Sequence, residues 1–361
     1  MNRNDAFRIA VFPGDGIGTE VTESALAVLE ALRPRLGVRL DYQHLPGGAA
    51  AYRDTGVALS DEAMRSATEA DAILFGAMGL PDVRYPDGTE IAPQLDMRFA
   101  MQLYAGVRPI RALPGGARVL IDPRAADIDL VLIRESTEGL FASRGKGTVE
   151  GDHTARDTQV ITRATSERLF DFAFRLAERR KQRGRPGKVT CVDKANVFVS
   201  FAFFRKIFYE RAVRFPGISA EHHYVDATAL DLVRRPWDFD VLVTENMFGD
   251  ILSDLGAALI GGMGMAPSAD IGDDHGLFQP AHGSAPDIAG QGLANPIAML
   301  QSTAMMLDWL GQRHELESLT DGAAAIDTAI ARVLAEDRAR PRDLGGSDGT
   351  DAITRAVIEA L

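Results

Sequence analysis

The sequence predicts an α/β fold with a largely parallel β-sheet. Short apolar runs of the length of buried strands recur along the chain, and segments with helical periodicity lie between several of them. Breaks rich in glycine and proline separate the two kinds of segment. The 361 residues suffice for two domains or for one large domain with a substantial core.

The predicted strands are the apolar runs at residues 8–12, 72–77, 130–134, 188–193 and 241–245. A first helix is predicted from Thr19, because apolar residues recur on one helical face: Val21, Ala25, Val28, Leu29 and Leu32. Thr19 is suited to cap this helix, and Glu20 falls in its first turn. Further helices are predicted at residues 164–182, 247–259 and 296–310, of which the first two end before glycines.

The overall charge and the single cysteine limit the class of protein. A formal net charge of -12 and an isoelectric point of about 5.1 argue against nucleic acid or an anionic membrane surface as the main partner. Cys191 is the only cysteine, so no intrachain disulfide can form. The first residues lack the apolar stretch of a signal peptide, and no run approaches the roughly 20 apolar residues of a membrane span. We therefore expect a cytoplasmic protein.

Glycines at positions 14, 16 and 18 lie between the first predicted strand and the first predicted helix. Their spacing, G-x-G-x-G, differs from the dinucleotide fingerprint G-x-G-x-x-G, and Asp15 would place a negative charge beside a pyrophosphate. A tight turn that requires glycine is the favoured interpretation, and the dinucleotide site of a Rossmann fold is the alternative.

The segment at residues 261–293 is long, irregular in pattern and rich in small residues, which in a compact enzyme more often indicates function than an idle loop. Within it, the small side chains of residues 282–286 would let the backbone approach a flat ligand closely. Asp287 could accept hydrogen bonds from a ribose diol. A turn with an incidental histidine explains the same residues.

Asp250 and Asp254 are four residues apart in the third predicted helix, so both carboxylates lie on one helical face. Two carboxylates in this arrangement can share one hard divalent cation, Mg2+ or Mn2+. Taken alone, the pair is more simply explained as two ordinary aspartates on a solvated face.

Basic residues next to apolar segments are candidates for substrate binding and proton transfer. Arginines that converge can bind carboxylates through two hydrogen bonds, and the candidates are Arg98, Arg108 and Arg134. Lys194 follows the predicted strand at 188–193 and is a candidate base or proton relay if it is desolvated. Surface charges, and for Lys194 a pairing with Asp193, are the simpler alternatives.

The order of these motifs resembles that of the isocitrate/isopropylmalate dehydrogenase family, the metal-dependent β-decarboxylating dehydrogenases. The similarity covers nearly the whole chain and includes PGDGIGTEV, RFAMQLYAGVRPIR, RESTEGLF, VDKANV, YVDATAL, NMFGDILSDLGAALIGGMGMAPSA, HGSAPDIAGQGLANP and DLGGSDGTDAI. The last segment and HGSAPDIAG look more like 3-isopropylmalate and tartrate or D-malate dehydrogenases than like NADP-dependent isocitrate dehydrogenases.

The resemblance implies an isopropylmalate dehydrogenase-like two-domain α/β fold that is not a Rossmann fold. A discontinuous first domain on the cofactor side is expected at residues 1–103 plus 262–361. A second domain is expected at residues 104–261, where it forms the interface of a homodimer. In the family, the site lies in a cleft between the domains and is completed by the partner subunit.

The resemblance also implies roles for individual residues. Arg98, Arg108 and Arg134 match the arginines that bind the substrate carboxylates. Asp250 and Asp254 match ligands of Mg2+ or Mn2+, and the partner subunit contributes a third ligand, Asp226, and the catalytic Lys194. The residues that match the adenosine pocket of NAD are His282, Gly283, Ser284, Ala285, Asp287, Ile288 and Asn295. NADP-dependent relatives commonly carry lysine and tyrosine in place of Asp287 and Ile288, so NAD is expected.

Two departures from the family pattern concern catalysis and substrate choice. Phe141 stands where the family usually has a tyrosine that helps to protonate the enolate, a contribution of roughly 10²- to 10⁴-fold. Just before Arg98, Gln94 and Leu95 offer one polar and one apolar side chain, where isopropylmalate enzymes tend to present an apolar pair. With Ile91, they suit an alkylmalate, malate, tartrate or a larger hydroxy acid.

The sequence therefore predicts NAD-dependent oxidative decarboxylation of a malate-type 2-hydroxy acid, with a 3-isopropylmalate-like substrate favoured. One alternative is a tartrate or D-malate dehydrogenase with the same machinery. Another is a weakly active or non-catalytic regulatory paralogue, which Phe141 favours and the intact lysine and aspartates oppose. The expected partners are a small dicarboxylate and a second copy of the chain with shared active sites, with neither nucleic acid nor a membrane involved.

Overall fold

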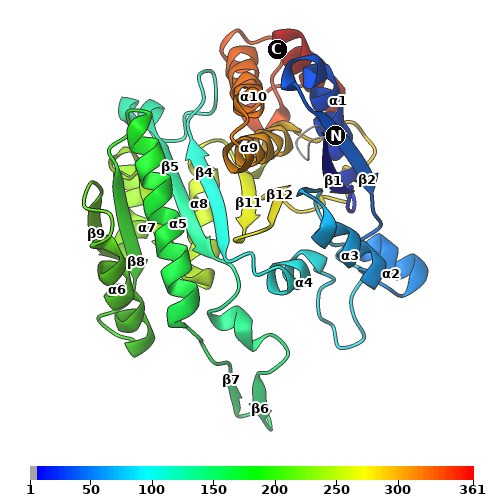
Figure 1. Ribbon diagram of the computed structural model, residues 1–361. Coiled ribbons are helices and arrows are strands. Elements are labelled where there is room, and N and C mark those ends of the chain that lie inside the picture. Colours follow the sequence, from blue (N-terminus) through cyan, green and yellow to red (C-terminus); the bar gives the residue numbers. More distant parts are fainter. Residues whose placement is uncertain (1–5) are drawn as a thin grey trace. The chain divides into compact units, whose positions relative to one another are not determined.

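Strands from both ends of the chain belong to one unit of the structure, and strands from its middle belong to another (Figure 1). This computed structural model describes residues 6–361. Unit 1 comprises residues 6–101, Leu113–Ala117 and Ile260–Leu361, and unit 2 comprises Gln102–Ala112 and Arg118–Leu259. Residues 1–5, on which the expectation of no signal peptide partly rests, lie outside the described residues. Within residues 6–361, no helix combines the length and apolar character needed to cross a bilayer.

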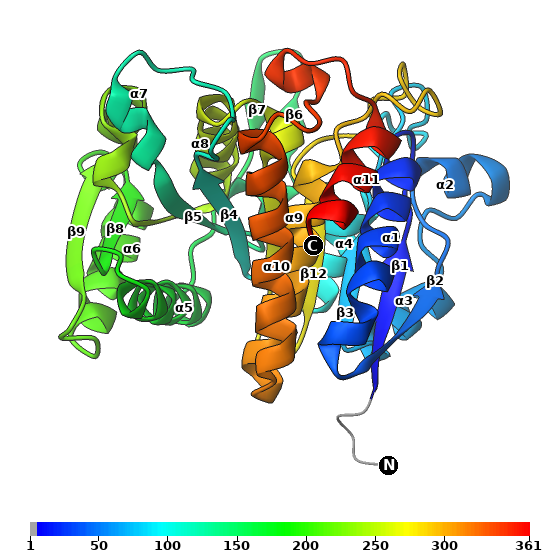
Figure 2. The same cartoon turned by 90° about the horizontal axis from the view of Figure 1, so that it is seen from above.

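In unit 1 the strand order is β2-β1-β3-β12-β11. β1 (Ala6–Phe12) pairs in parallel with β2 (Arg39–His44) and β3 (Ala72–Phe75). β12 (Gly276–Pro280) is parallel to β3, and β11 (Pro267–Ile271) is antiparallel to β12. The helices of this unit are α1 (Gly18–Leu36), α2 (Ala49–Thr55), α3 (Asp61–Glu69), α4 (Pro93–Ala100), α9 (Ile297–His314), α10 (Glu317–Ala335) and α11 (Thr350–Ala360). α9 packs on β11 and β12 and contacts α1 and α10, which in turn contact α11 (Figure 2).

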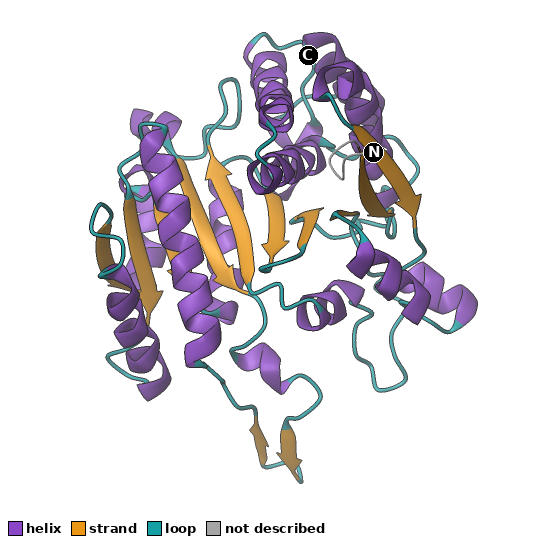
Figure 3. Cartoon of the chain, in the orientation of Figure 1, coloured by secondary structure: helices purple, strands orange, loops and turns teal. Residues whose placement is uncertain are grey.

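In unit 2 the strand order is β4-β5-β10-β8-β9. β4 (Ala105–Arg111) is antiparallel to β5 (Asp129–Glu135), whereas β5, β10 (Val241–Thr244), β8 (Lys188–Asp193) and β9 (Ser219–Tyr224) run parallel. α5 (Arg163–Gln182) and α6 (Val199–Ala212) cover one face of these strands, and α7 (Val225–Arg234) and α8 (Asn246–Leu259) cover the other. β6 (Thr148–Glu150) and β7 (Thr154–Arg156) form a separate antiparallel hairpin (Figure 3).

The predicted α/β class and the largely parallel pairing are confirmed, and each predicted strand and helix is present within a few residues. The inner strands β3 and β10 are buried at every position, which is why they read as continuous apolar runs. The segment at 261–293 is less irregular than expected, because it contains the antiparallel pair β11 and β12.

The predicted cap at Thr19 is wrong. α1 begins at Gly18 with Ile17 at its N-cap, so Thr19 lies inside the first turn, and no side chain caps this end of the helix. Backbone carbonyls replace a side-chain cap, since the N–H of Gly18 donates to the carbonyl of Asp15 and the N–H of Ile17 to that of Ser284. Glu20 is in the first turn, as predicted.

Candidate active site

An arginine and an aspartate meet at the start of α8 in unit 2. Arg134, near the end of β5, is 4% exposed. Its Nε and Nη2 donate to Oδ1 of Asn246 at 3.0 and 2.7 Å, and its Nη1 forms an ion pair with Asp250. Asn246 is the first residue of α8 and lies one turn before Asp250. Strand and helix therefore hold the guanidinium beside a carboxylate.

Asp254 lies one further turn along the same helix. Burial raises the pKa of its carboxyl and the negative charge of Asp250 raises it further, whereas the positive charges of Arg108 and Arg134 lower it. Arg108 is buried on β4. The structure thus brings together four predicted site residues of unit 2. Two neighbouring carboxylates are hard oxygen donors whose mutual repulsion a divalent cation would relieve, so this donor set fits Mg2+ or Mn2+.

Lys194 and Asp226 form a second cluster in unit 2. Lys194 follows β8, Asp226 lies in the first turn of α7, and Nζ is 2.6 Å from Oδ1. The hydrogen bond from Lys194 lowers the pKa of Asp226. Among residues 6–361, no three acidic, histidine or cysteine side chains are grouped so that they could hold a metal, so Asp226 does not join Asp250 and Asp254 within one chain.

Phe141 lies in the short 3-10 helix η2 (Leu140–Ser143) and contacts Arg134. The guanidinium carbon of Arg134 is 5.1 Å from the centroid of the ring, within the range of a cation–π contact. Phe141 is thus next to the arginine of the first cluster, but it carries no titratable group.

In unit 1, α4 carries Gln94, Leu95 and Arg98. Arg98 is buried, and its Nη2 is 3.0 Å from Oδ2 of Asp270 on β11. Oε1 of Gln94 and Nε of Arg98 are both buried without a hydrogen-bond partner in the described part of the chain. Since residues four apart share one helical face, α4 presents an acceptor and a donor that a ligand could satisfy.

Ile91 does not belong to this group of side chains. It is 1% exposed and packs in an apolar cluster with Ala49 and Ala58. The structure places Ile91 in the core of unit 1, and its part in shaping a substrate pocket stays a prediction.

The glycine-rich turn after β1 is a tight structural turn, as favoured. Gly14 and Gly16 have φ of 86° and 55°, the left-handed region that glycine adopts without strain. A Cβ at Gly16 would lie 2.1 Å from the carbonyl oxygen of Ser284, so the turn packs directly against the 282–287 segment. The turn therefore positions that segment.

The carboxylate of Asp15 in this turn is bound inside the fold. Asp15 is 2% exposed and accepts hydrogen bonds at 2.7 to 2.8 Å from three backbone N–H groups, those of Ala49, Ala50 and Gly79. Two of these groups belong to the first turn of α2, where a negative charge is stabilised. The dinucleotide-fingerprint alternative is wrong, because the carboxylate of Asp15 is already bound by backbone N–H groups inside the fold.

The predicted cofactor residues occupy the loop between β12 and α9. Ser284 is buried, and its Oγ donates to the carbonyl of Gly79. Burial lowers the pKa of His282, whose Nδ1 lies 2.9 Å from the carbonyl oxygen of Gly283. Its Nε2 is buried and has no partner among residues 6–361. Gly283 and Asp287 are exposed, whereas Ala285 and Ile288 are partly buried.

Asn295 ends this loop, and its side chain already has partners in the protein. Oδ1 accepts from the N–H of Ile297 at 3.1 Å, at the start of α9, and Nδ2 donates to Asp343 at 3.1 Å. Asn295 therefore fixes the end of the loop against α9 and the segment around Asp343.

Sequence reasoning missed two buried glutamates beside the Arg134 cluster. Glu135 is 3% exposed and accepts from Thr137 and Glu138 at 2.6 and 2.7 Å, and burial raises its pKa to about 7. Glu245 accepts from two N–H groups at the start of α8, and burial raises its pKa. Both end apolar strands in the sequence, which is the signal that could have found them. Asn246 and Asp270 were missed because neither residue belongs to a local sequence pattern that indicates a site.

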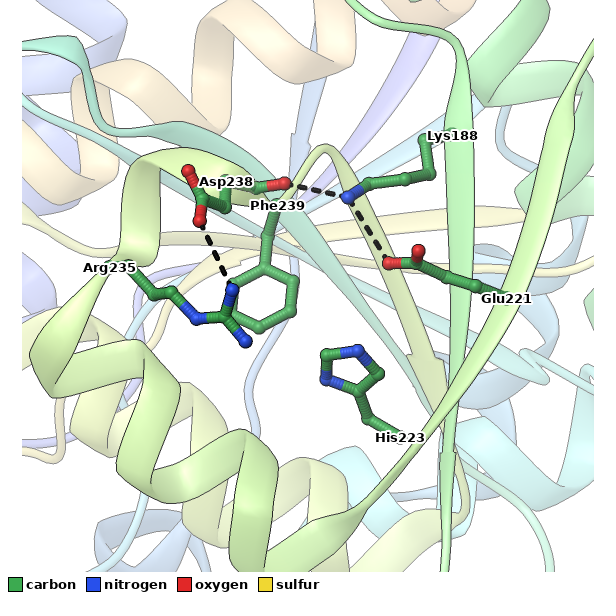
Figure 4. Close-up of a pocket in the computed structure, with 6 residues that line it drawn as sticks. All are labelled: Lys188, Glu221, His223, Arg235, Asp238 and Phe239. Atoms are coloured by element: carbon green, nitrogen blue, oxygen red, sulfur yellow. Dashed lines mark hydrogen bonds and ion pairs between the residues drawn. The ribbon is translucent and has the colours of Figure 1, made fainter.

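A polar pocket of about 330 Å³ lies elsewhere in unit 2 (Figure 4). Its lining residues are Lys188, Glu221, His223, Arg235, Asp238 and Phe239. Lys188 bonds to the carbonyl of Asp238 at 2.8 Å and pairs with Glu221 at 3.1 Å. The charges of this pocket are thus paired with one another, and no predicted site residue lines it.

Comparisons with known proteins agree with this fold. Residues 8–361 match the family model described as isocitrate/isopropylmalate dehydrogenase. The chain is 42% identical over 355 residues to the 3-isopropylmalate/3-methylmalate dehydrogenase of Methanocaldococcus jannaschii, with 98% of each chain covered. It is 41% identical over 357 residues to the 3-isopropylmalate dehydrogenase of Methanothermobacter thermautotrophicus, with 99% of each covered. The crystal structure of isocitrate dehydrogenase from Methylococcus capsulatus aligns with a TM-score of 0.86 at 36% identity, over 98% of this chain and 99% of that one.

The two α/β units have the fold of the decarboxylating dehydrogenases related to isocitrate dehydrogenase, which differs from the Rossmann fold. The chain belongs to the isocitrate/isopropylmalate dehydrogenase family.

Proposed function

We propose that the protein is an NAD-dependent dehydrogenase that oxidises a malate-type 2-hydroxy acid and decarboxylates the product with the help of Mg2+ or Mn2+. The observation that carries this proposal is the cluster of Arg134, Asp250 and Asp254 at the start of α8. Binding an anionic substrate through a metal cation requires carboxylates for the metal next to a positive group for the substrate. This cluster supplies both. The names of the two relatives support a 3-isopropylmalate-like substrate.

We assign Arg98, Arg108 and Arg134 to the substrate carboxylates. Their exposed fractions are 6%, 7% and 4%, so each guanidinium has lost most of its hydration and gains from an anionic partner. Asn246 accepts from two nitrogens of Arg134 and fixes the plane of this guanidinium before a carboxylate arrives.

We assign Asp250 and Asp254 to the metal, with Asp226 of a second copy as the third ligand. When bound, the cation supplies positive charge beside the substrate hydroxyl and makes its proton easier to remove. Lys194 is the group assigned to accept that proton, and Asp226 holds its Nζ at 2.6 Å. Because Phe141 has no acidic proton, another group or water must protonate the product carbon.

The loop at residues 281–296 is assigned to NAD. The exposed carboxylate of Asp287 would accept hydrogen bonds from a free ribose diol and would repel the 2′-phosphate of NADP. Nε2 of His282 is buried without a partner within residues 6–361, so a cofactor atom there would remove an unsatisfied polar group. When bound, the nicotinamide of NAD would be the hydride acceptor.

A tartrate or D-malate dehydrogenase is the second candidate, and the buried, unsatisfied Oε1 of Gln94 favours tartrate as its substrate. The second hydroxyl of tartrate could donate to this oxygen, whereas the isopropyl group of isopropylmalate and the CH2 group of D-malate could not. The weakly active or non-catalytic paralogue is opposed by the intact cluster on α8 and by the Lys194–Asp226 pair.

We further propose a cytoplasmic homodimer with shared active sites. Three large apolar side chains of the packed helices α7 and α8 are exposed: Leu230 by 55%, Val233 by 48% and Ile251 by 63%. A second copy that covers this face would remove them from water.

The test is NADH formation with Mn2+ across 3-isopropylmalate, D-malate, tartrate, isocitrate and larger 3-substituted malates, with CO2 release followed in parallel. We expect matched NADH and CO2 from an alkylmalate. A preference for tartrate would select the second candidate. No NADH from any of these acids would refute the enzyme proposal and leave the non-catalytic paralogue.

A further inference from the structure

Arg98 belongs to a buried chain of three polar side chains within unit 1. Its Nη2 is 3.0 Å from Oδ2 of Asp270, and the two side chains are 7% and 0% exposed. The same Oδ2 accepts a hydrogen bond from Nε2 of Gln279 at 2.9 Å. Asp270 lies on β11 and Gln279 on the adjacent strand β12. A rigid strand pair thus holds the carboxylate, and the carboxylate holds the arginine on α4.

A contribution to stability alone does not explain this arrangement. A buried ion pair stabilises a fold only when the remaining donors also find partners. Nε of Arg98 is buried and lacks a hydrogen-bond partner in the part of the chain that the structure describes. Leaving a charged donor unsatisfied is unfavourable, and an incoming carboxylate would satisfy it.

We infer that Asp270 is a positioning residue for substrate binding: it fixes the guanidinium of Arg98 while leaving Nε for a substrate carboxylate, and Gln279 supports it. This inference rests on the proposed function, in which Arg98 binds that carboxylate. Without Asp270, the buried guanidinium of Arg98 loses this counter-charge, and its long side chain is expected to turn towards water.

The experiment compares Asp270→Ala and Asp270→Asn with the wild type. It measures kcat, KM for the best hydroxy acid, Tm, and the Kd of malate with Mn2+ by calorimetry. We expect KM and Kd to rise about tenfold in Asp270→Ala with kcat nearly unchanged, because a hydrogen-bonded charge that positions the binding group is lost. Asp270→Asn keeps an oxygen at the same place and should restore much of the loss. Gln279→Leu should also raise KM, by a smaller factor than Asp270→Ala.

A double-mutant cycle separates positioning from a general loss of stability. In an Arg98→Lys background, Asp270→Ala should add less than about twofold to the Kd, since its effect acts through the arginine. The matched control is Asp240→Ala in unit 2, because Asp240 is equally buried and pairs with Arg180 at 2.6 Å. This control should lower Tm and leave KM and Kd unchanged.

Unchanged KM and Kd in the Asp270 variants, with only Tm lowered, would overturn the inference and leave the proposed function intact. If Asp270→Ala does not fold, unchanged values in both Asp270→Asn and Gln279→Leu would overturn it equally. A wild-type protein that neither binds nor oxidises any of the dicarboxylates would overturn the proposed function, and the inference with it.

Discussion

The ring of Phe141 lies against the guanidinium of Arg134, with 5.1 Å between the guanidinium carbon and the ring centroid. Arg134 is held at the same time by Asn246 and Asp250. The aromatic ring therefore packs against a guanidinium whose position is fixed. Phenylalanine keeps the cation–π contact that a tyrosine would make here, but it lacks the phenol proton.

Replacing Phe141 should therefore separate binding from proton donation. Phe141→Tyr is expected to raise the rate of product formation, by up to about 100-fold if protonation is limiting, because the phenol adds a general acid. Phe141→Leu, the matched variant without a ring, should raise the substrate KM about threefold through loss of the cation–π contact. Steady-state rates of product formation would check both, and an equal rate in wild type and Phe141→Tyr would refute the acid role.

The metal assignment predicts a large effect of Asp254→Asn. Loss of one carboxylate ligand should raise the Mn2+ concentration for half-maximal activity by about 100-fold or more, and chelation of the metal should abolish turnover. Manganese binding to the unliganded protein can be measured independently by calorimetry. Asp321→Asn, an exposed aspartate on α10, removes the same charge elsewhere and should leave Mn2+ binding unaltered.

The NAD assignment predicts that Asp287 determines cofactor choice. Asp287→Lys should weaken the binding of NAD+ and strengthen the binding of NADP+. The ratio of kcat/KM for the two cofactors is expected to shift towards NADP+ by more than about tenfold. Ser284→Ala serves as a comparison, because this hydroxyl bonds to the backbone of Gly79 and should affect both cofactors alike. An unchanged ratio in Asp287→Lys would remove the assignment of this loop to the ribose.

A site shared between two copies predicts complementation. Lys194→Ala and Asp254→Asn should each be inactive as pure proteins. Mixed after dissociation and reassociation, they should recover about a quarter of wild-type activity, because half of the dimers are mixed and each mixed dimer has one intact site. No recovery in a mixture proven to contain mixed dimers would show that Lys194 and Asp254 act within the same chain.

Glu135 predicts a specific dependence of stability on pH. Burial raises its pKa from 4.5 to about 7, so the folded protein binds this proton more tightly than the unfolded chain does. The stabilisation is complete below pH 4.5 and is lost as the pH rises through about 7, a change of at most about 3 kcal/mol. Glu135→Gln cannot ionise and should lack this loss.

Urea unfolding of wild type and Glu135→Gln between pH 4.5 and 8 would measure the difference. Glu62→Gln, an exposed substitution of the same kind, controls for the change in net charge. A stability difference that does not vary over this range would mean that Glu135 is ionised throughout, held by its hydrogen bonds from Thr137 and Glu138.

Elements buried on both faces were the ones that the sequence predicted well. β10 and most of β5 are buried, so their apolar runs identify them without reference to the rest of the chain. β2 and β9 are largely exposed or half-buried and read as polar, so only their pairing in three dimensions defines them as strands. The antiparallel pair of β11 and β12 was hidden in a segment whose small residues look like a loop.

The candidate site was predicted as separate motifs, because spacing along a helix is local information. The pairing of Asp250 with Asp254 follows from the helical period. The contacts of Arg134 with Asn246, and of Arg98 with Asp270, join residues more than 100 positions apart. No local pattern reports such contacts, and neutral partners such as Asn246 give no signal of charge.

The split of unit 1 between the two ends of the chain has a consequence for synthesis on the ribosome. β3 emerges about 200 residues before β12, its parallel neighbour, which at typical rates is a wait of roughly 10 to 40 seconds. During that time the edge of the apolar run at Ala72–Phe75 is open to other nascent chains. Unit 2, whose strands all lie between Ala105 and Thr244, is complete earlier and can fold while the other unit still waits for its last strands. The protein is therefore expected to depend on chaperones for its first hundred residues more than for its middle.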